Sequence, residues 1–465
     1  MPRSEAAAAA TACDAADDTH PPAPAPAPRA LARDQHSISR KNINRNALKV
    51  LYRLHKDGYQ AHLVGGGVRD LLLGRQPKDF DIATDATPEQ VRALFRNCRL
   101  IGRRFRLAHV VFGRDVVEVA TFRADHSSAD DEDDADVVRQ DDGRILRDNV
   151  FGTIEEDAFR RDFTVNALYY DISRFAVLDY TGALADLEAK RLRLIGDPEA
   201  RYREDPVRML RAARFAAKLG FDVDPATAAP IVECGPLLRD IPPSRLFDEV
   251  LKLFVTGHAR ASLEHLLRLD LLQYLFPGAD AALKAGDAGV TALFERALEN
   301  TDRRLADDKP VTPAFLYAVL LWPVALARAN ELRDREGESP VMAMQRAGAE
   351  AADGQQAYTA LPKRFSGPMR EIWLLQPKLE RYRGKRAKRL LTHPRLRAAW
   401  DFLCLRRDAG EDVGEYCDWW QRAMEAHAQG DAPPAESAAG AAQQAPRNKR
   451  RRRGGRRRRS GQSGE

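Results

Sequence analysis

Two aspartates one residue apart, Asp79 and Asp81 in the stretch "DFDIAT", have the chemistry to hold a metal ion. In an extended strand successive side chains alternate between the two faces, so both carboxylates would project to one side while Phe80 and Ile82 face a core. Neighbouring carboxylates repel each other unless a cation lies between them, and Mg²⁺ prefers such oxygen ligands. The pattern predicts a Mg²⁺ site; the alternative is a strand end that leads into a solvated loop.

A glycine run precedes these aspartates and suits the binding of a phosphate. In "HLVGGGVRDLLLG", Gly65, Gly66 and Gly67 follow a predicted strand and open a predicted helix. Bare backbone N–H groups at a helix N-terminus can approach an anion closely, and Arg69, one turn into the helix, could grip a phosphate with its planar guanidinium. The run is neither a GxGxxG dinucleotide fingerprint nor a GxxxxGKS P-loop, so both of those phosphate loops are excluded.

The elements that must position these residues indicate an α+β fold. Short β-like runs such as "QAHLVGG", "DFDIAT" and "VVEVATF" alternate with helical pieces, which predicts one mixed sheet with helices. In "ATPEQV", Thr87 is expected to cap a helix that has Pro88 in its first position and Gln90 in a capping box. After about residue 185 the pattern is almost wholly helical. We therefore predict a head at 38–185, a helical neck at 186–255 and a helical body at 256–430.

The ends of the chain differ in composition from this middle part. Residues 1–37 are rich in alanine and proline, lack the cationic and apolar pattern of a signal peptide, and are expected to form a disordered leader. Residues 431–465 end in "RNKRRRRGGRRRRSGQSGE", which has ten basic residues and one acid, a charge of +9. The whole chain carries +6, so its first 446 residues sum to −3. The tail predicts an electrostatic clamp on RNA or DNA, with a solubility or targeting tail as the alternative.

Composition narrows the class of protein further. The 465 residues are 44% hydrophobic and 31% charged, with no apolar run of the roughly eighteen residues that a membrane span needs. Five cysteines are spread widely, without the spacing of zinc ligands, and are expected to be reduced thiols in a cytoplasmic protein. The acidic run "DDEDDAD", residues 130–136, is expected to be a surface loop, with a metal-binding patch as the alternative.

The order of glycine turn, helix and DxD resembles the nucleotidyltransferase superfamily, in the version used by bacterial poly(A) polymerases and tRNA CCA-adding enzymes. "RRDFTVNAL", residues 160–168, resembles the second motif of the family, which implies that Arg161 and Asp162 orient the incoming nucleotide. The alternative is a plain helix start capped by Asp162 or Thr164. The resemblance covers roughly residues 35–430.

A further motif resembles the helix that reads the nucleotide base in this family. "EDPVRMLRAARFAAKLGF", residues 204–221, implies base-reading roles for its Asp and Arg side chains. A helix that starts after Asp205 would bury one stripe and leave Arg208 and Arg211, three residues apart, on another face. The predicted buried stripe consists of Met209, Ala212, Ala213 and Ala216.

The resemblance also implies a third catalytic carboxylate. Glu118 is a lone charge in the apolar strand "VVEVATF", where the family places its third acid; a buried salt bridge with an arginine is the alternative. Asp162 is the rival for that role, and the sequence does not separate them. The expected site therefore holds two Mg²⁺ ions on Asp79, Asp81 and Glu118.

Three features favour poly(A) polymerases over CCA-adding relatives. "LIGRRFRLAHVVFG", residues 100–113, resembles the stretch that distinguishes the two groups, and residues 361–406 are similar to the C-terminal domain of bacterial poly(A) polymerases. The chain has no His-Asp dipeptide of the phosphohydrolase domain that many proteobacterial CCA-adding enzymes append. Within the first stretch, Arg103, Arg104 and Arg106 would suit a polyanionic substrate, or form a solvated basic turn.

The resemblance implies an enzyme that transfers AMP from ATP to RNA 3′ ends without a template, releases pyrophosphate and promotes RNA decay. Its partners would be ATP, Mg²⁺ and RNA, with no membrane association and a monomeric state. The alternatives are a CCA-adding enzyme, a non-catalytic RNA-binding protein with the same fold, and a nucleotide-binding regulator.

Deletion of residues 447–465 tests the predicted role of the tail. Each phosphate contact on single-stranded nucleic acid contributes about −0.7 to the slope of log K against log salt. We therefore expect the deletion to weaken RNA binding and to flatten this slope, measured by fluorescence anisotropy over a salt series. An unchanged slope would rule out the clamp.

Overall fold

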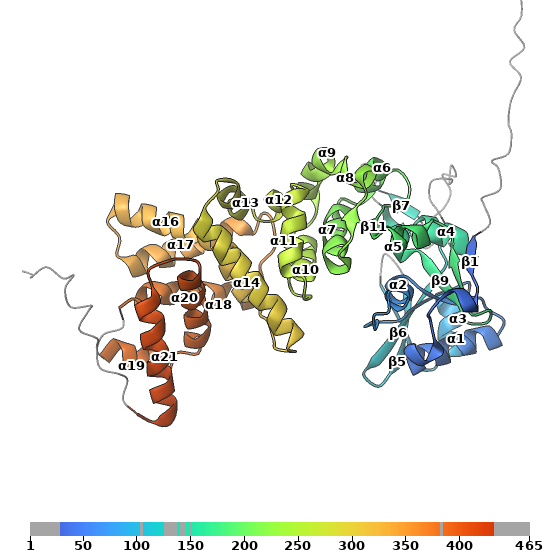
Figure 1. Cartoon of the computed structure of the whole chain (residues 1–465), viewed down its shortest axis with the longest axis horizontal. Coiled ribbons are helices and arrows are strands. Elements are labelled where there is room, and N and C mark those ends of the chain that lie inside the picture. Colours follow the sequence, from blue (N-terminus) through green and yellow to red (C-terminus); the bar gives the residue numbers. More distant parts are fainter. Residues whose placement is uncertain are drawn as a thin grey trace, which may run out of the picture. The chain divides into compact units, whose positions relative to one another are not determined.

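The computed structural model forms two compact units (Figure 1). Unit 1 contains residues up to Ile241 together with Glu264–Leu271, and unit 2 contains Pro242–Leu263 and the chain from Leu272 onward. The structure describes residues 28–102, 106–124, 137–139, 145–148, 151–381 and 385–431. The acidic run 130–136, Arg103, Arg104 and the arginine-rich tail therefore lie outside the described residues. The unit boundary at 241 falls inside the predicted neck, and the division into neck and body stays a prediction.

Unit 1 is built on a mixed eight-stranded sheet, as the sequence predicts. The strand order is β1-β10-β9-β2-β3-β6-β5-β4, and all neighbours are antiparallel except β3 and β6, which are parallel. The strands are β1 (Arg29–Leu31), β2 (Ala61–Val64), β3 (Asp81–Thr84), β4 (Cys98–Ile101), β5 (Leu107–Phe112), β6 (Asp115–Thr121), β9 (Leu168–Asp171) and β10 (Ala176–Asp179). Two short ribbons, β7 (Val137–Arg139) with β8 (Ile145–Asp148) and β11 (Arg191–Leu192) with β12 (Asp222–Val223), stand apart from it.

The first strand corrects the predicted leader. Residues 29–31 pair antiparallel with β10, with Ala30 opposite Leu178, so a leader that reaches residue 37 is wrong. His36 also contacts the carbonyl of Phe175, at 2.8 Å. An edge strand offers unpaired N–H and C=O groups to any short extended segment, and three residues without alternating hydrophobicity give no local signal of this pairing.

The helices of unit 1 begin and end at residues that the sequence identifies. Helix α1 (Arg45–Lys56) buries Leu51 and Leu54 and stops before Gly58, whose φ is +91°. Helix α3 (Pro88–Leu94) has the predicted capping box, in which the Gln90 amide donates to Thr87 Oγ1 and the Thr87 amide donates to Gln90 Oε1. The others are α2 (Gly66–Leu72), α4 (Ile154–Phe159), α5 (Ala183–Glu188), α6 (Pro198–Glu204), α7 (Val207–Leu219), α8 (Pro225–Ala228) and α9 (Ile231–Cys234).

Unit 2 is helical throughout the described residues, as predicted. Buried tryptophans tie its helices together: Trp373 Nε1 donates to the carbonyl of Ala318 at 3.0 Å, and Trp420 Nε1 donates to that of Leu379 at 2.9 Å. Its helices are α10 (Pro243–Phe254), α12 (Leu272–Leu275), α13 (Pro277–Lys284), α14 (Ala288–Ala306), α15 (Pro313–Leu320), α16 (Trp322–Glu336), α17 (Pro340–Gln355), α18 (Lys363–Leu379), α19 (Lys385–Leu391), α20 (Leu396–Asp408) and α21 (Gly414–Gln429); α11 (Ala259–Arg268) is divided between the units.

No single helix in the described ranges has the length and apolar composition to cross a membrane, although the bent pair α15 and α16 meets both criteria jointly.

Candidate active site

Two of the predicted acids come from two neighbouring strands, and a third lies just before one of these strands. In the parallel pair of β3 and β6, Ile82 lies opposite Val119, so Asp81 and Glu118, one residue earlier on each strand, point to the other face of the sheet. Asp79 precedes β3 by two residues and is exposed, while the intervening Phe80 is buried. The alternation predicted from "DFDIAT" is therefore present in the structure.

The pKa of Asp81 depends on the charges of the other two carboxylates. Burial, and then the charges of Glu118 and Asp79, raise the pKa of Asp81 to about 6, while Arg161 and His109 act in the opposite direction. Such a raised value means that ionised Asp81 is short of positive charge. The donor set consists only of carboxylate oxygens, which fits Mg²⁺. In the part of the chain that the structure describes, however, no three acid, histidine or cysteine side chains already converge on one point.

His109 belongs to this group although it is not among the predicted site residues. It lies directly opposite Glu118 in the antiparallel pair of β5 and β6, and its Nε2 is 3.3 Å from Glu118 Oε2. Both side chains are partly exposed. The alternation of "LAHVVF" places His109 on the face of Glu118, and this signal was available in the sequence.

The glycine turn has a backbone that only glycine adopts readily. Gly65, at φ +67° and ψ −138°, caps α2, and its amide donates to the carbonyl of Leu168 at 3.2 Å. A Cβ at Gly65 would lie 3.6 Å from Arg161 Nη1, and one at Gly66 would lie 3.3 Å from Arg69 Nη2. The turn therefore brings bare backbone close to two arginines.

Arg69 does not present its guanidinium at the surface. The side chain is 1% exposed; Nε and Nη2 donate to Asp70 Oδ1 at 2.9 and 2.7 Å, and Nη1 donates to Asn166 Oδ1. The sequence predicts that Arg69 binds a phosphate, whereas in this structure its guanidinium donates hydrogen bonds to other side chains of the protein. Asp70 and Asn166, the latter 97 residues away in the chain, accept the hydrogen bonds of this guanidinium.

Arg161 is the cation that faces both the glycine turn and the acids. Its Nη2 donates to Asp157 Oδ2 at 2.8 Å and its Nε to the Tyr169 hydroxyl at 3.0 Å, which leaves Nη1 on the side of Gly65. Although burial favours the neutral acid, Arg161 and Arg160 hold the pKa of Asp157 below its ordinary value. Asp157 and Tyr169 thus fix Arg161; the i,i+4 spacing of Asp157 and Arg161 was the available signal for this contact.

The carboxylate of Asp162 accepts hydrogen bonds from other groups of the protein. Its Oδ2 accepts from Arg211 Nε at 2.8 Å, and its Oδ1 accepts from the Phe163 amide at 2.8 Å and from Asn166 Nδ2 at 3.2 Å. Burial opposes ionisation, but Arg211 and these hydrogen bonds lower the pKa of Asp162 to about 2. This arrangement makes Asp162 the residue that positions Arg211.

The predicted base-reading helix is present as α7. Its predicted buried stripe is confirmed, since the four residues Met209, Ala212, Ala213 and Ala216 are all 0% exposed. Asp205 caps the end of α6, and its Oδ1 accepts from the Val207 amide at 3.3 Å. Arg208 and Arg211 both remain partly exposed beside the buried stripe.

Arg208 is held in place by a neighbouring acid. Its Nη1 donates to Glu204 Oε2 at 2.6 Å, and Arg201 donates to the same oxygen at 2.9 Å. Arg201 Nη2 in turn donates to the carbonyls of Arg160 and Arg161, at 2.6 and 2.8 Å. Glu204 and Arg201 therefore connect α7 to the motif that contains Arg161. Of the predicted basic turn, Arg106 is described, and it pairs with Glu89 at 2.8 Å on the surface.

Substitution of Asp162 by asparagine tests the Asp162–Arg211 ion pair. The pKa of Asp162 is lower in the folded chain than in the unfolded chain, so its stabilisation is complete above about pH 4 and is lost as pH falls toward 2. A shift of this size corresponds to about 2 kcal/mol at neutral pH. We expect Asp162→Asn to lower the free energy of unfolding by about that amount at pH 7, with the difference narrowing below pH 4.

Urea denaturation followed by circular dichroism measures this effect, because all five tryptophans lie in unit 2 and their fluorescence does not report on unit 1. Asp57→Asn is the control, since the ion pair of Asp57 with Arg53 is exposed and contributes little. A destabilisation by Asp162→Asn that does not depend on pH would contradict the assignment.

Three family models match this chain. Residues 61–193 match the Poly A polymerase head domain, residues 220–283 match the Probable RNA and SrmB- binding site of polymerase A, and residues 336–459 match the Polymerase A arginine-rich C-terminus. The first match contains the glycine turn, the carboxylates and Arg161.

Curated relatives and solved structures agree with these matches. Poly(A) polymerase I of Salmonella typhimurium is 49% identical over 409 residues, 87% of each chain, and that of Escherichia coli O6:H1 is 50% identical over 407 residues, 87% of this chain and 86% of the relative. A CCA-adding enzyme of Bacillus pumilus is 37% identical over 50% of this chain and 55% of its own. The solved Bacillus stearothermophilus CCA-adding enzyme in complex with CTP aligns with a TM-score of 0.51 and 29% identity over 81% of this chain and 80% of that chain. About half of the aligned residues are thus identical to those of poly(A) polymerases over most of the chain. The chain belongs to the bacterial poly(A) polymerase family.

Proposed function

We propose that this protein adds adenylate residues to RNA 3′ ends without a template, transferring AMP from ATP to the 3′-hydroxyl and releasing pyrophosphate. The observation that carries the proposal is the register of β3 against β6, which brings Asp81 and Glu118 together on one face beside Asp79. Nucleotidyl transfer needs such an acidic site, because its catalysis consists mainly of positioning and charge neutralisation.

Asp79, Asp81 and Glu118 are the residues that would hold Mg²⁺. When bound there, Mg²⁺ neutralises phosphate charge and lowers the pKa of the attacking 3′-hydroxyl. Glu118 would be kept in orientation by His109, at 3.3 Å. Because Asp162 is occupied by Arg211, it would act through that arginine and not as a metal ligand.

The triphosphate of ATP would lie against the glycine turn. Gly65 and Gly66 have no side chain to block the approach, and Arg161 Nη1 faces the same turn. Arg69 would support this surface from behind through Asp70 and Asn166. This division of roles makes Arg161 the phosphate-binding cation and Arg69 a positioning residue.

Selection of adenine would fall to Asp205, Arg208 and Arg211. Without a template, side chains of the protein have to take the place of the complementary base. Fixed hydrogen-bonding groups discriminate strongly between bases, because a wrong base leaves these groups unpaired. Glu204 holds Arg208 and Asp162 holds Arg211, so both guanidinium groups are fixed before a nucleotide arrives. Such fixed donors suit the choice of one base.

Asparagine at position 81 tests the metal site. Asp81→Asn removes one charge from the cluster without a large change of shape, and we expect AMP incorporation to fall by about 10³-fold or more, because several kcal/mol of charge stabilisation are lost. RNA affinity and the circular dichroism spectrum should stay unchanged. Glu89→Gln, an exposed acid on α3, is the matched control and should retain full activity.

The same extension assay separates the candidate activities. An unstructured RNA and a tRNA that lacks its terminal triplet are each incubated with one nucleoside triphosphate at a time, with and without Mg²⁺. Extension by ATP alone on the unstructured RNA is the expected result. Incorporation of CTP on the truncated tRNA would instead identify a CCA-adding enzyme, and near-normal extension by Asp81→Asn would refute the metal assignment.

A further inference from the structure

A basic hollow lies in unit 2, where the end of α18 meets α19. It has a volume of about 440 Å³ and is lined by Val341, Pro377, Lys378, Arg381, Arg389, Leu390 and His393. The lining contains four basic side chains and no acid. The apolar atoms come from Val341, Pro377 and Leu390, so the hollow offers both cations and a hydrophobic floor. We call this set of residues the basic hollow.

Among the described residues, no acid forms an ion pair with the lysine and arginine side chains of the basic hollow. These side chains are Lys378, Arg381 and Arg389. The acids nearest to them in the sequence form ion pairs with other arginines. Glu380 binds Arg406 at 3.1 Å, and Glu371 binds Arg395 at 3.2 Å. Like charges gathered without counter-charges repel each other, so an arrangement of this kind favours binding of an anion.

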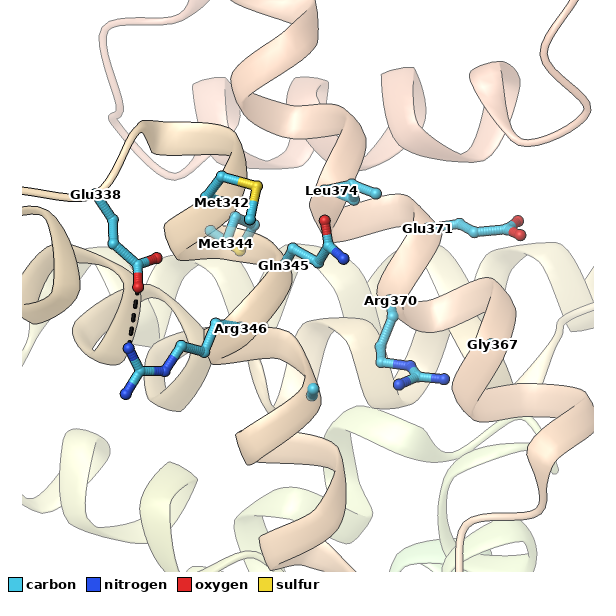
Figure 2. A pocket seen from close by; sticks show the side chains of 10 residues that line it. Glu338, Met342, Met344, Gln345, Arg346, Gly367, Arg370, Glu371 and Leu374 are labelled. Atoms are coloured by element: carbon cyan, nitrogen blue, oxygen red, sulfur yellow. Dashed lines mark hydrogen bonds and ion pairs between the residues drawn. The ribbon is translucent and has the colours of Figure 1, made fainter.

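A second hollow of similar size between α17 and α18 shows the contrast. It has a volume of about 520 Å³, and its lining contains two acids, Glu338 and Glu371, and two arginines, Arg346 and Arg370. Figure 2 shows Arg346 turned toward Glu338, which it contacts at 3.0 Å, while Arg370 and Glu371 point in different directions from α18. Arg346 also binds Glu336 and Glu350. This hollow is balanced in charge, so the excess of cations distinguishes the basic hollow from it.

The helix dipole accounts for only part of this excess. Lys378 lies in the last turn of α18 and Arg381 just after it, where the negative helix end attracts cations. Arg389 comes from α19, and His393 follows that helix. Cations from two separate segments therefore converge on one hollow, which the end of a single helix does not require.

His393 adds a directed donor to the basic hollow. Its Nδ1 accepts the backbone N–H of Arg395 at 3.1 Å. A backbone amide can only donate, so in the neutral ring the proton must reside on Nε2. In this tautomer the Nε2–H group can donate to a phosphate oxygen.

We propose that the basic hollow binds phosphodiester groups of single-stranded RNA, with Lys378, Arg381 and Arg389 on the phosphates. Val341, Pro377 and Leu390 would pack against a sugar or base. The unpaired cations favour a polyanion, because mobile polyanions bind through arrays of lysine and arginine and release counterions when they do so. The inference rests on the proposed function only in the choice of RNA as the polyanion.

The test compares two triple variants of the full chain with equal loss of charge. The first variant, Lys378→Ala/Arg381→Ala/Arg389→Ala, removes three cations from the basic hollow. The second variant, Arg333→Ala/Arg335→Ala/Arg397→Ala, removes three exposed arginines elsewhere in unit 2. Binding of a labelled unstructured oligoribonucleotide is measured by anisotropy over a salt series. We expect the first variant alone to lose about 10- to 100-fold in affinity at about 100 mM salt and to flatten the salt slope by about 2.

The outcomes separate this inference from the proposed function. In extension assays the first variant should show a raised KM for RNA and an unchanged kcat. Equal slopes for both triple variants, or no change in either, would overturn the inference. If the first variant does not fold, the single variants Arg381→Gln and Arg389→Gln at exposed positions decide in the same assay. Failure of the unmodified protein to extend RNA would refute the proposed function, while the slope comparison would still decide the role of the basic hollow.

Discussion

The pairing of β3 with β6, which holds carboxylates together on one face of the sheet, is the constraint on which the candidate site in unit 1 depends. The parallel pairing of β3 with β6 fixes Asp81 beside Glu118, and the charge of Asp79, two residues before β3, acts on Asp81 as well. Their mutual repulsion and the burial of Asp81 raise its pKa to about 6. A backbone that forces acids together gains nothing in stability from doing so, which is why such a cluster indicates function.

A second layer of ion pairs surrounds this cluster and fixes the cations that face it. Asp157 holds Arg161, Asp162 holds Arg211, and Glu204 holds Arg208. Asn166 connects two parts of this layer, since it accepts from Arg69 and donates to Asp162. Long arginine side chains lose much rotamer freedom on binding a ligand, and arginines that are already fixed by acids lose less at that moment.

The elements and most of the acids could be predicted from the sequence because their signals are local. The DxD alternation, the glycine turn, the capping box at Thr87 and the buried stripe of α7 all depend on residues within one or two turns. Glu118 stood out as a lone charge in an apolar strand. The resemblance to a known family supplied the order of motifs and the roles of Arg161 and Asp205.

The rest depended on contacts between distant parts of the chain. The burial of Arg69 follows from Asn166, 97 residues later, and the occupation of Asp162 follows from Arg211, 49 residues later. Residues 29–31 form a strand because β10 offers an open edge and not because their sequence favours one. His109 was detectable by alternation, but its importance appears only when the register places it opposite Glu118.

Binding of Mn²⁺, used as a spectroscopic probe of the Mg²⁺ site, tests the central claim most directly. Titration of the full-length protein, followed by electron paramagnetic resonance, measures metal affinity without any need for catalysis. We expect Glu118→Gln to weaken Mn²⁺ binding by about tenfold or more, because a charged ligand is lost, and Asp162→Asn to leave it nearly unchanged. Equal affinity in the Glu118→Gln variant, or loss of binding only in Asp162→Asn, would contradict the assignment of Asp79, Asp81 and Glu118 as the metal-binding set.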